Sequence, residues 1–298
     1  MKLLSPSETA SLLPYDRLAA SIAEVLEDAR AGRAVAPARE VHPLPDGGTL
    51  LLMPAWNEHL GVLKRVSVHP GNPARGLAQV QAELLVFDVR TGEARLVLDG
   101  ATVTARRTAA LSLLAVERLR AGKVRQALLI GAGVQARAHL EALAVLRPER
   151  LYVYNRTFSR ASELAAYGRG LGLAVQTVPF PDKVAASVDL VVSATSSPTP
   201  LVPEGLADDA LIVAVGAFTP EMAEVPATLV RRARVYVDTL EGARSEAGDL
   251  LQAGVDWREV RTLAQVQAPV KGPVVFKSVG SALWDLAAAR LAYGANST

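Results

Sequence analysis

The sequence of 298 residues contains no cysteine. This absence excludes disulfide bonds, thiolate nucleophiles and cysteine-ligated zinc sites. Histidine is scarce too, and the four copies do not have the spacing of metal ligands; they are His42, His59, His69 and His139. No paired carboxylates indicate a glycosidase. We therefore expect no metal site, and we expect each histidine to be structural or exposed rather than catalytic.

Aromatic residues and long apolar runs are also few. Aromatics make up 5% of the chain, whereas proteins that bind single-stranded nucleic acid need stacking aromatics beside a basic groove. The 32 basic and 30 acidic residues form no long block of one sign. No apolar run approaches the length of a membrane span, and Pro6, Ser7 and Glu8 come too early for a signal-peptide core. We expect a soluble cytoplasmic protein with no nucleic-acid or membrane partner.

The first part of the chain has the pattern of an α+β domain. Apolar residues recur at helical spacing over residues 15–29, and Gly32 is the expected stop. Strand-like segments follow at residues 49–53, 60–68, 79–88 and 93–99, separated by turns such as Thr91-Gly92. Consecutive strands with short connections predict antiparallel pairing.

The second part of the chain has a different pattern, in which predicted strands and helices alternate. A helix is expected over residues 105–120, and short apolar strands at 126–130, 150–154, 174–178, 189–193, 210–214 and 234–238. Crossover helices fit between them, for example at 135–146 and 159–167, and six such strands match a doubly wound sheet. A last helix at 281–293 is expected to return to the first domain. We therefore expect an α/β protein: a Rossmann domain over residues 120–278, and a substrate-binding and dimerisation domain over 1–119 with 279–298.

A glycine motif directly follows the first parallel strand. Gly131-Ala132-Gly133-Val134-Gln135-Ala136 is the dinucleotide fingerprint in its alanine-ended form. Gly131 allows the tight turn, Gly133 lets the backbone approach a pyrophosphate, and Ala136 lets the helix and strand pack closely. The phosphates would lie at the N-terminus of a helix beginning near Val134. Because strand, motif, helix and second strand occur in the right order, we favour a dinucleotide site over an ordinary glycine turn.

The end of the second strand indicates which dinucleotide binds. Enzymes that use NAD place an acidic residue here to bind the ribose 2′-hydroxyl. This chain has Asn155-Arg156-Thr157 instead, with Arg160 close behind. A guanidinium binds a 2′-phosphate that a carboxylate would repel, so we predict NADP(H), with NAD(H) as the alternative. The competing interpretation is that Arg156 only stacks on the adenine or points into solvent.

Cations are the remaining chemical candidates in the first domain. Arg39, Lys64, Arg106 and Arg107 stand beside apolar stretches, although most lysines and arginines are simply solvated. Arg107 stands at the start of the expected helix, where the dipole disfavours a cation. Its presence there suggests an anionic ligand.

Eight segments, spread over nearly the whole chain, belong together. They are Ala36-Pro-Ala-Arg39, Met53-Pro54, Lys64 with Val66-Ser-Val-His-Pro-Gly-Asn-Pro-Ala-Arg-Gly76, Thr104-Ala-Arg-Arg-Thr-Ala-Ala110, Gly131-Ala-Gly-Val-Gln-Ala136, Ser193-Ala-Thr-Ser-Ser197, Val215-Gly216 and Phe276-Lys-Ser-Val-Gly280. In this order they resemble the ornithine cyclodeaminase/mu-crystallin family. The resemblance implies a homodimer built through N-terminal domains whose sheets form a shared barrel. It also implies a substrate lying between that domain and the nicotinamide.

The resemblance also implies roles for individual residues. Arg39 and Arg107 match arginines that bind the substrate carboxylate, and Lys64 matches a lysine near the reacting carbon and nitrogen. A planar guanidinium suits a carboxylate and a lysine can exchange a proton, so the chemistry agrees. The cofactor-binding residues implied by the fingerprint and the family segments are Gly131, Gly133, Val134, Gln135, Asn155, Arg156, Thr157, Arg160, Ala194, Thr195, Ser196, Val215, Gly216 and Ser278.

Two departures separate this chain from the cyclodeaminases. They carry a glutamate two residues before Met-Pro, where this chain has Leu51, and an aspartate after Val-Gly, where it has Phe218 or Thr219. An ammonium left unpaired in a dry pocket costs several kcal/mol. Glu221 and Glu224 lie downstream, but we expect them to be surface or supporting residues.

We therefore expect an oxidoreductase that uses NAD(P)H to reduce small cyclic imino acids. Δ1-Pyrroline-2-carboxylate would give L-proline, or its six-membered homologue Δ1-piperideine-2-carboxylate would give L-pipecolate, with Lys64 aiding proton delivery. The alternatives are an NAD-dependent ornithine cyclodeaminase, an alanine dehydrogenase, and a cofactor-binding protein without turnover.

Overall fold

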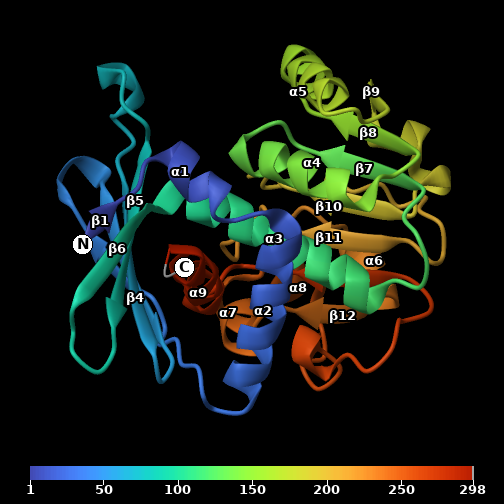
Figure 1. Cartoon of the computed structure of the whole chain (residues 1–298). Helices are drawn as coiled ribbons and strands as arrows, with labels where there is room; N and C mark the ends of the chain where they lie inside the picture. Colours follow the sequence, from blue (N-terminus) through green and yellow to red (C-terminus); the bar gives the residue numbers. More distant parts are fainter. Residues whose placement is uncertain (297–298) are drawn as a thin grey trace. The chain divides into compact units, whose positions relative to one another are not determined.

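The computed structural model describes residues 1–296 of the chain. They form two compact units, which we call the N-terminal unit (residues 1–111 with 281–296) and the central unit (Ser112–Gly280). Figure 1 labels most of their helices and strands. Short 3-10 turns occur at Pro45–Gly47, Pro73–Arg75, Pro181–Lys183, Ala185–Ser187 and Leu263–Gln265. No helix within residues 1–296 is both long enough and apolar enough to span a membrane.

The N-terminal unit contains a six-stranded sheet in the order β1-β6-β5-β4-β3-β2. Its strands are β1 (Lys2–Leu3), β2 (Glu40–Pro43), β3 (Thr49–Trp56), β4 (Leu60–Val68), β5 (Val80–Asp88) and β6 (Ala94–Asp99). β3 to β6 pair antiparallel, as expected; β2 also pairs antiparallel, with β3, and β1 pairs parallel with β6. Gly92, in the predicted turn between β5 and β6, has a φ of 73°. The two edge strands were not predicted, because β1 is two residues long and every residue of β2 is exposed.

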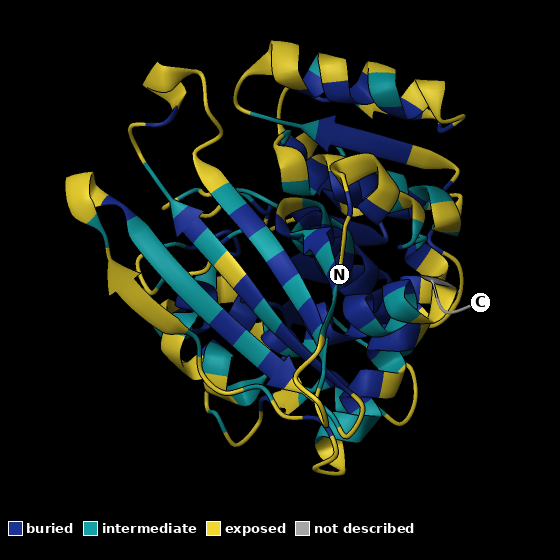
Figure 2. Cartoon of the chain, turned by 60° about the vertical axis from the view of Figure 1, so that its left-hand side comes forward, coloured by how far each residue is buried: buried dark blue, intermediate teal, exposed yellow. Residues whose placement is uncertain are grey.

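One face of this sheet is buried under helices. Figure 2 shows buried and partly buried residues alternating along its strands, which is the period-2 pattern of a sheet with one covered face. The helices of this unit are α1 (Pro6–Ser11), α2 (Tyr15–Arg30), the first part of α3 (Gly100–Leu119) and α9 (Ala282–Asn296). The C-terminal helix α9 contacts α2, β3 and β4, so the prediction that it returns to the first part of the chain is confirmed.

The central unit contains an eight-stranded parallel sheet in the order β13-β12-β14-β11-β10-β7-β8-β9. Its strands are β7 (Gln126–Ile130), β8 (Arg150–Tyr154), β9 (Val175–Thr177), β10 (Leu190–Ser193), β11 (Leu211–Ala214), β12 (Arg234–Val237), β13 (Arg261–Thr262) and β14 (Val274–Lys277). From β9 to β11 the order is that of strands 3-2-1-4-5 of a Rossmann fold. The doubly wound sheet predicted from the sequence is therefore confirmed.

The sheet has two strands more than the six expected. The four residues of β14 lie between β11 and β12, inside the sheet, and only three of them are apolar. The fourth is Lys277, which is fully buried because it pairs with a carboxylate. Such a strand is not predicted from its apolar residues, because the apolar run is short and ends in a lysine.

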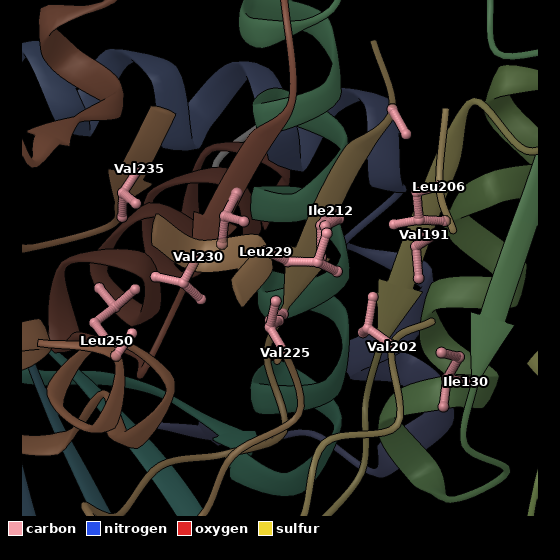
Figure 3. Packing of buried hydrophobic residues seen from close by; sticks show 14 of the residues in the cluster. Ile130, Val191, Val202, Leu206, Ile212, Val225, Leu229, Val230, Val235 and Leu250 are labelled. Atoms are coloured by element: carbon pink, nitrogen blue, oxygen red, sulfur yellow. The ribbon is translucent and has the colours of Figure 1, made fainter. Parts of the chain in front are cut away.

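The helices of the central unit are the second part of α3, α4 (Val134–Leu146), α5 (Phe158–Gly170), α6 (Ala227–Arg232), α7 (Leu240–Glu246) and α8 (Gly248–Ala253). α4 and α5 are the predicted crossover helices. Figure 3 shows part of the core, in which Ile212 of β11 lies near Leu229 of α6, and Val191 of β10 lies beside Leu206. Burying each such side chain contributes about 1.5 to 3 kcal/mol. This core fixes the strand ends, and with them the loops that follow.

Candidate functional site

The turn after β7 requires glycine for two reasons. Gly131 has a φ of +116°, in the region that side chains rarely adopt. A Cβ added to it would lie 2.6 Å from the carbonyl oxygen of Ala194, the residue after β10. The chain can therefore pass from strand to helix here only without a side chain.

The N-terminus of α4 is open to a ligand. The helix begins at Val134, as predicted, and its N-cap Gly133 provides no side-chain hydrogen bond. A Cβ added to Gly133 would meet nothing within 4 Å, and Val134 is 73% exposed. The first N–H groups of a helix bind phosphate through hydrogen bonds and the helix dipole. The residues present here fit the pyrophosphate of a dinucleotide.

The other predicted cofactor residues follow strands that neighbour β7. Residues 194–196 follow β10, Val215 and Gly216 follow β11, Ser278 follows β14, and residues 155–157 follow β8. Because β8, β7, β10, β11 and β14 are consecutive in a parallel sheet, their carboxyl ends form one edge. The strand order reverses direction at β7, which is where such sheets bind nucleotides. The structure thus brings the predicted set together along that edge.

The arginines after β8 are exposed. Asn155 folds the turn by donating from its side-chain amide to the carbonyl of Thr157 at 2.9 Å, and Thr157 is the N-cap of α5. Arg156 precedes this helix and Arg160 lies in its first turn, with no acidic residue in that turn. Neither arginine forms an ion pair with any residue in the described range 1–296. Both guanidiniums are available to an anion.

Glu224 ties two of these loops together, and it is fully buried. Its Oε1 accepts hydrogen bonds from the Ser193 hydroxyl at 2.7 Å and from the N–H and hydroxyl of Thr195 at 2.7 and 3.0 Å. Its Oε2 accepts from the N–H groups of Gly216 and Ala217 at 2.6 and 3.0 Å. Glu221 and Glu224 were expected to be surface or supporting residues. Glu224 is a supporting residue, because it holds the loops after β10 and β11, and Glu221 is exposed at the surface.

Two further buried aspartates hold the same edge. Asp249 accepts from the N–H groups of Glu224 and Val225 at 2.6 and 2.8 Å and lies 2.7 Å from Nζ of Lys277. Asp238 accepts from the Ser278 hydroxyl at 2.7 Å. Sequence reasoning missed these residues. Asp238 directly follows the short apolar strand β12, which is its signal, whereas Asp249 lies in α8 and has no such signal.

A second cluster, in the N-terminal unit, contains the predicted catalytic lysine. Nζ of Lys64 lies 2.7 Å from Oδ2 of Asp285, with side chains 2% and 0% exposed. Nε of Arg107 lies 3.5 Å from Oδ1 of the same carboxylate. Lys64 lies on β4, Arg107 on α3 and Asp285 on α9. Three separate segments therefore meet at one buried carboxylate.

Burial lowers the pKa of Lys64 from 10.5 to about 8, because the ammonium has lost its water. Asp285 opposes this change through its charge and hydrogen bond, while the charges of Arg107 and Arg39 add to it. Arg39 directly precedes β2 and is partly buried. The three cations predicted to act together thus share one electrostatic environment.

Two expectations about the arginines need correction. α3 begins at Gly100, where the Asp99 carboxylate accepts from the Thr102 N–H at 2.7 Å, so Arg107 lies in the helix interior. The helix dipole therefore gives no reason for its charge, and Asp285 is its partner instead. Arg106 stacks on the Tyr15 ring at 3.9 Å and donates to the Leu13 carbonyl, which is a structural role.

Asp285 was missed from the sequence, although a signal exists. It is the one charged residue in the run from Ala282 to Ala289 of α9, between Trp284 and Leu286. A carboxylate in such a run is rarely buried unless it is paired. Its partners are distant in sequence, so the pairing itself had no local signature.

The positions that distinguish cyclodeaminases carry no charge here. Leu51 lies on the same face of β3 as Met53, which pairs with Lys64 across the strands. Phe218 is 50% exposed and Thr219 is partly buried. Because both oxygens of Glu224 already accept backbone hydrogen bonds, this carboxylate is committed to the loops. Within residues 1–296, no three His, Asp or Glu side chains are grouped so as to hold a metal ion.

Comparison with known proteins agrees with this geometry. The profile of the ornithine cyclodeaminase/mu-crystallin family matches residues 2–297. The chain belongs to this family. Delta(1)-pyrroline-2-carboxylate reductase 1 of Burkholderia multivorans is 45% identical, with 96% of this chain and 93% of that protein covered. The Delta(1)-pyrroline-2-carboxylate/Delta(1)-piperideine-2-carboxylate reductase of Azospirillum brasilense is 44% identical, covering 98% and 97%.

A solved structure of a protein similar to this chain has the same fold. It is the Delta(1)-pyrroline-2-carboxylate reductase of Thermococcus litoralis in complex with NADH and L-proline. The TM-score is 0.90 at 29% identity, covering 99% of this chain and 97% of that one. The family resemblance and the fold class inferred from the sequence are both confirmed.

Proposed function

We propose that this protein reduces small cyclic imino acids with NAD(P)H. The substrate is Δ1-pyrroline-2-carboxylate, giving L-proline, or its six-membered homologue, giving L-pipecolate. The observation that carries the proposal is that two cations, Lys64 and Arg107, share the single buried carboxylate of Asp285, while the charge of Arg39 also acts on Lys64. The positive charge left over fits a ligand that brings a carboxylate of its own. The reductases that share 44 and 45% identity with this chain act on such molecules.

The residues of the N-terminal unit have separate roles in this proposal. Arg39 and Arg107 bind the substrate carboxylate, for which a planar guanidinium is suited. Lys64 donates a proton to the imine nitrogen as the carbon is reduced. A pKa of about 8 keeps Lys64 protonated at neutral pH and makes it a stronger acid than an ordinary lysine. Proton donation of this kind contributes about 10²- to 10⁴-fold to a rate.

The central unit holds the cofactor in this proposal. The N–H groups following Gly133 bind the pyrophosphate, and the loops after β10, β11 and β14 contact the nicotinamide end. When bound, the reduced nicotinamide supplies the hydride that the imine carbon accepts. Arg156 and Arg160 bind the 2′-phosphate, so we propose that NADPH is preferred over NADH. The absence of a carboxylate after β8 supports this preference.

The same geometry argues against ornithine cyclodeamination. That reaction needs a carboxylate for the side-chain ammonium of ornithine. Leu51, Phe218 and Thr219 offer none, and Glu224 is committed to the loops. An ammonium left without a partner would cost several kcal/mol in a buried site.

We also propose that the protein is a homodimer through its N-terminal unit. Both edge strands of the six-stranded sheet expose an apolar residue, Leu3 on β1 and Val41 on β2. Open edges of this kind favour pairing with another chain. Light scattering coupled to size exclusion tests this assembly: twice the chain mass supports it, and a monomer at assay concentrations contradicts it.

The test of the proposed function is a spectrophotometric assay of NADPH and NADH oxidation. The substrates are the five- and six-membered imines, ornithine, and pyruvate with ammonia. We expect NADPH oxidation with a cyclic imine to be the fastest reaction. Release of ammonia from ornithine at a higher rate, without net cofactor oxidation, would identify a cyclodeaminase instead. A requirement for pyruvate and ammonia would identify an alanine dehydrogenase.

A further inference from the structure

One carboxylate oxygen of Asp285 faces each of the two cations on its neighbouring elements. Oδ2 lies 2.7 Å from Nζ of Lys64, and Oδ1 lies 3.5 Å from Nε of Arg107. The two oxygens of a carboxylate are fixed relative to each other. Asp285 therefore sets the position of the ammonium relative to the guanidinium.

Stability alone does not explain this buried arrangement. Removing a lysine and an aspartate from water costs several kcal/mol each, and their attraction often only offsets that cost. Well-packed apolar side chains of similar volume would serve a core at least as well. A buried Lys64–Asp285 pair is therefore better explained by what it does for the site.

The charges around Lys64 show what the carboxylate does. Lys64 on β4 faces Arg107 from α3, Arg39 from the segment before β2 and Asp285 from α9. Burial and both guanidiniums favour the neutral amine, whereas the charge and hydrogen bond of Asp285 favour the ammonium. Asp285 therefore acts to retain the proton of Lys64, against burial and the two guanidiniums.

We infer that Asp285 is a positioning residue for the reduction: it keeps Lys64 protonated and holds the ammonium beside the carboxylate-binding Arg107. This inference rests on the proposed function. In the step it supports, an N–H bond of the Lys64 ammonium breaks and an N–H bond forms at the imine nitrogen. Lys64 becomes a neutral amine and regains a proton from solvent before the next turnover.

The test compares pH profiles of kcat/KM for NADPH-dependent imine reduction. In the wild-type enzyme the rate falls above about pH 8, where Lys64 loses its proton. Asp285→Asn removes the charge and keeps the size, so the fall in rate moves to lower pH by about 1 to 3 units. A merely structural role would lower the rate equally at every pH and leave the profile in place, which would overturn the inference.

Asp189→Asn is the matched control, because Asp189 also forms a mostly buried ion pair, 3.0 Å from Arg120, in the central unit. Its profile should keep the wild-type position. Asp285→Glu covers the case in which Asp285→Asn does not fold. Asp285→Glu keeps the negative charge but displaces it. The fall in kcat/KM should therefore stay near pH 8, while kcat decreases about 10- to 100-fold.

Wild-type kcat in Asp285→Glu would show that the position of the carboxylate is unimportant, and would overturn the inference. Thermal unfolding and NADPH fluorescence establish that each variant folds and binds cofactor. Failure of the inference is distinguishable from failure of the function. An active wild-type enzyme with an unmoved profile in Asp285→Asn contradicts only the role of Asp285. A wild-type enzyme inactive on both imines contradicts the proposed function and this inference with it.

Discussion

The Glu224 carboxylate accepts a hydrogen bond of 2.6 Å from the backbone N–H of Gly216. A Cβ on Gly216 would lie 2.7 Å from the same side chain, and 2.0 Å from the carbonyl oxygen of Thr195. The contact therefore requires both a glycine in the loop after β11 and a fully buried carboxylate beneath it. It joins that loop to the one after β10, and both belong to the proposed nicotinamide-binding edge.

Glu224→Gln tests how much the link between these two loops contributes to cofactor binding. An amide oxygen accepts fewer and weaker hydrogen bonds than a carboxylate, and the amide NH₂ would face N–H donors. Losing about 1.5 to 3 kcal/mol from the loops should raise the NADPH dissociation constant about tenfold or more and lower the Tm. Fluorescence titration measures the binding. The exposed Glu221→Gln is the control and should bind NADPH as the wild type does.

Lys64→Met separates proton delivery from cofactor binding. Methionine keeps the bulk of the side chain but has no proton to donate, so kcat for imine reduction should fall about 10²- to 10⁴-fold. The NADPH dissociation constant should not change, because the proposed cofactor residues lie in the central unit. Arg65→Met, one residue further along β4 and exposed, is the control. Equal activity in Lys64→Met and the wild type would remove Lys64 from the mechanism.

Arg156→Asp addresses the choice between the two cofactors. A carboxylate after β8 repels a 2′-phosphate and accepts a hydrogen bond from a 2′-hydroxyl. NADPH should bind about 10- to 100-fold more weakly, while NADH binds as well or better, as isothermal titration would show. Arg150→Asp places the same charge at the opposite end of the same strand as a control. Unchanged NADPH affinity in Arg156→Asp would contradict a role for this guanidinium.

His139 predicts how stability depends on pH. It is buried, its Nδ1 donates to the Gln135 carbonyl at 2.7 Å, and its Nε2 lies 2.9 Å from the Ser112 hydroxyl. Burial lowers its pKa from 6.5 to about 4. Between these values the unfolded chain binds more protons than the folded one, so stability falls as the pH drops through that window.

At pH 5 the loss attributable to His139 is about 2 kcal/mol, from the difference between the two pKa values. His139→Gln should abolish this part of the pH dependence in urea unfolding curves recorded at pH 7 and pH 5. The exposed His42→Gln should retain it. If the free energy of unfolding fell by the same amount between pH 7 and pH 5 in the wild type and in His139→Gln, the role given to His139 would be contradicted.

The sequence was sufficient to predict the elements that have a strong local period. The strands at 60–68, 126–130 and 150–154 have the predicted ends, because each lies between clear turn residues. The helix at Tyr15–Arg30 was equally clear from its apolar face. The weaker strands, β2 and β14, carry exposed or charged residues and lack that period.

The site was predictable only in part, for a physical reason. Lys64 and Arg107 stand in segments that resemble known ones, so their type and position identified them. Asp285 pairs with Lys64 on another element, and Glu224 accepts a hydrogen bond from Thr195, 29 residues earlier; a buried carboxylate has no local pattern that names such partners. The start of α3 was placed five residues late because Gly100 does not look like a helix residue, although Asp99 caps the helix.

Transfer of hydride to the carbon of a cyclic imine is the central claim, and isotope labelling tests it directly. NADPH carrying deuterium on either face of nicotinamide C4 is incubated with the protein and Δ1-pyrroline-2-carboxylate in ordinary water, and the product is analysed by mass spectrometry and NMR. We predict L-proline with one deuterium at C2 from one of the two labelled cofactors. Proline without deuterium from either cofactor, or no reduction of either imine, would contradict the account.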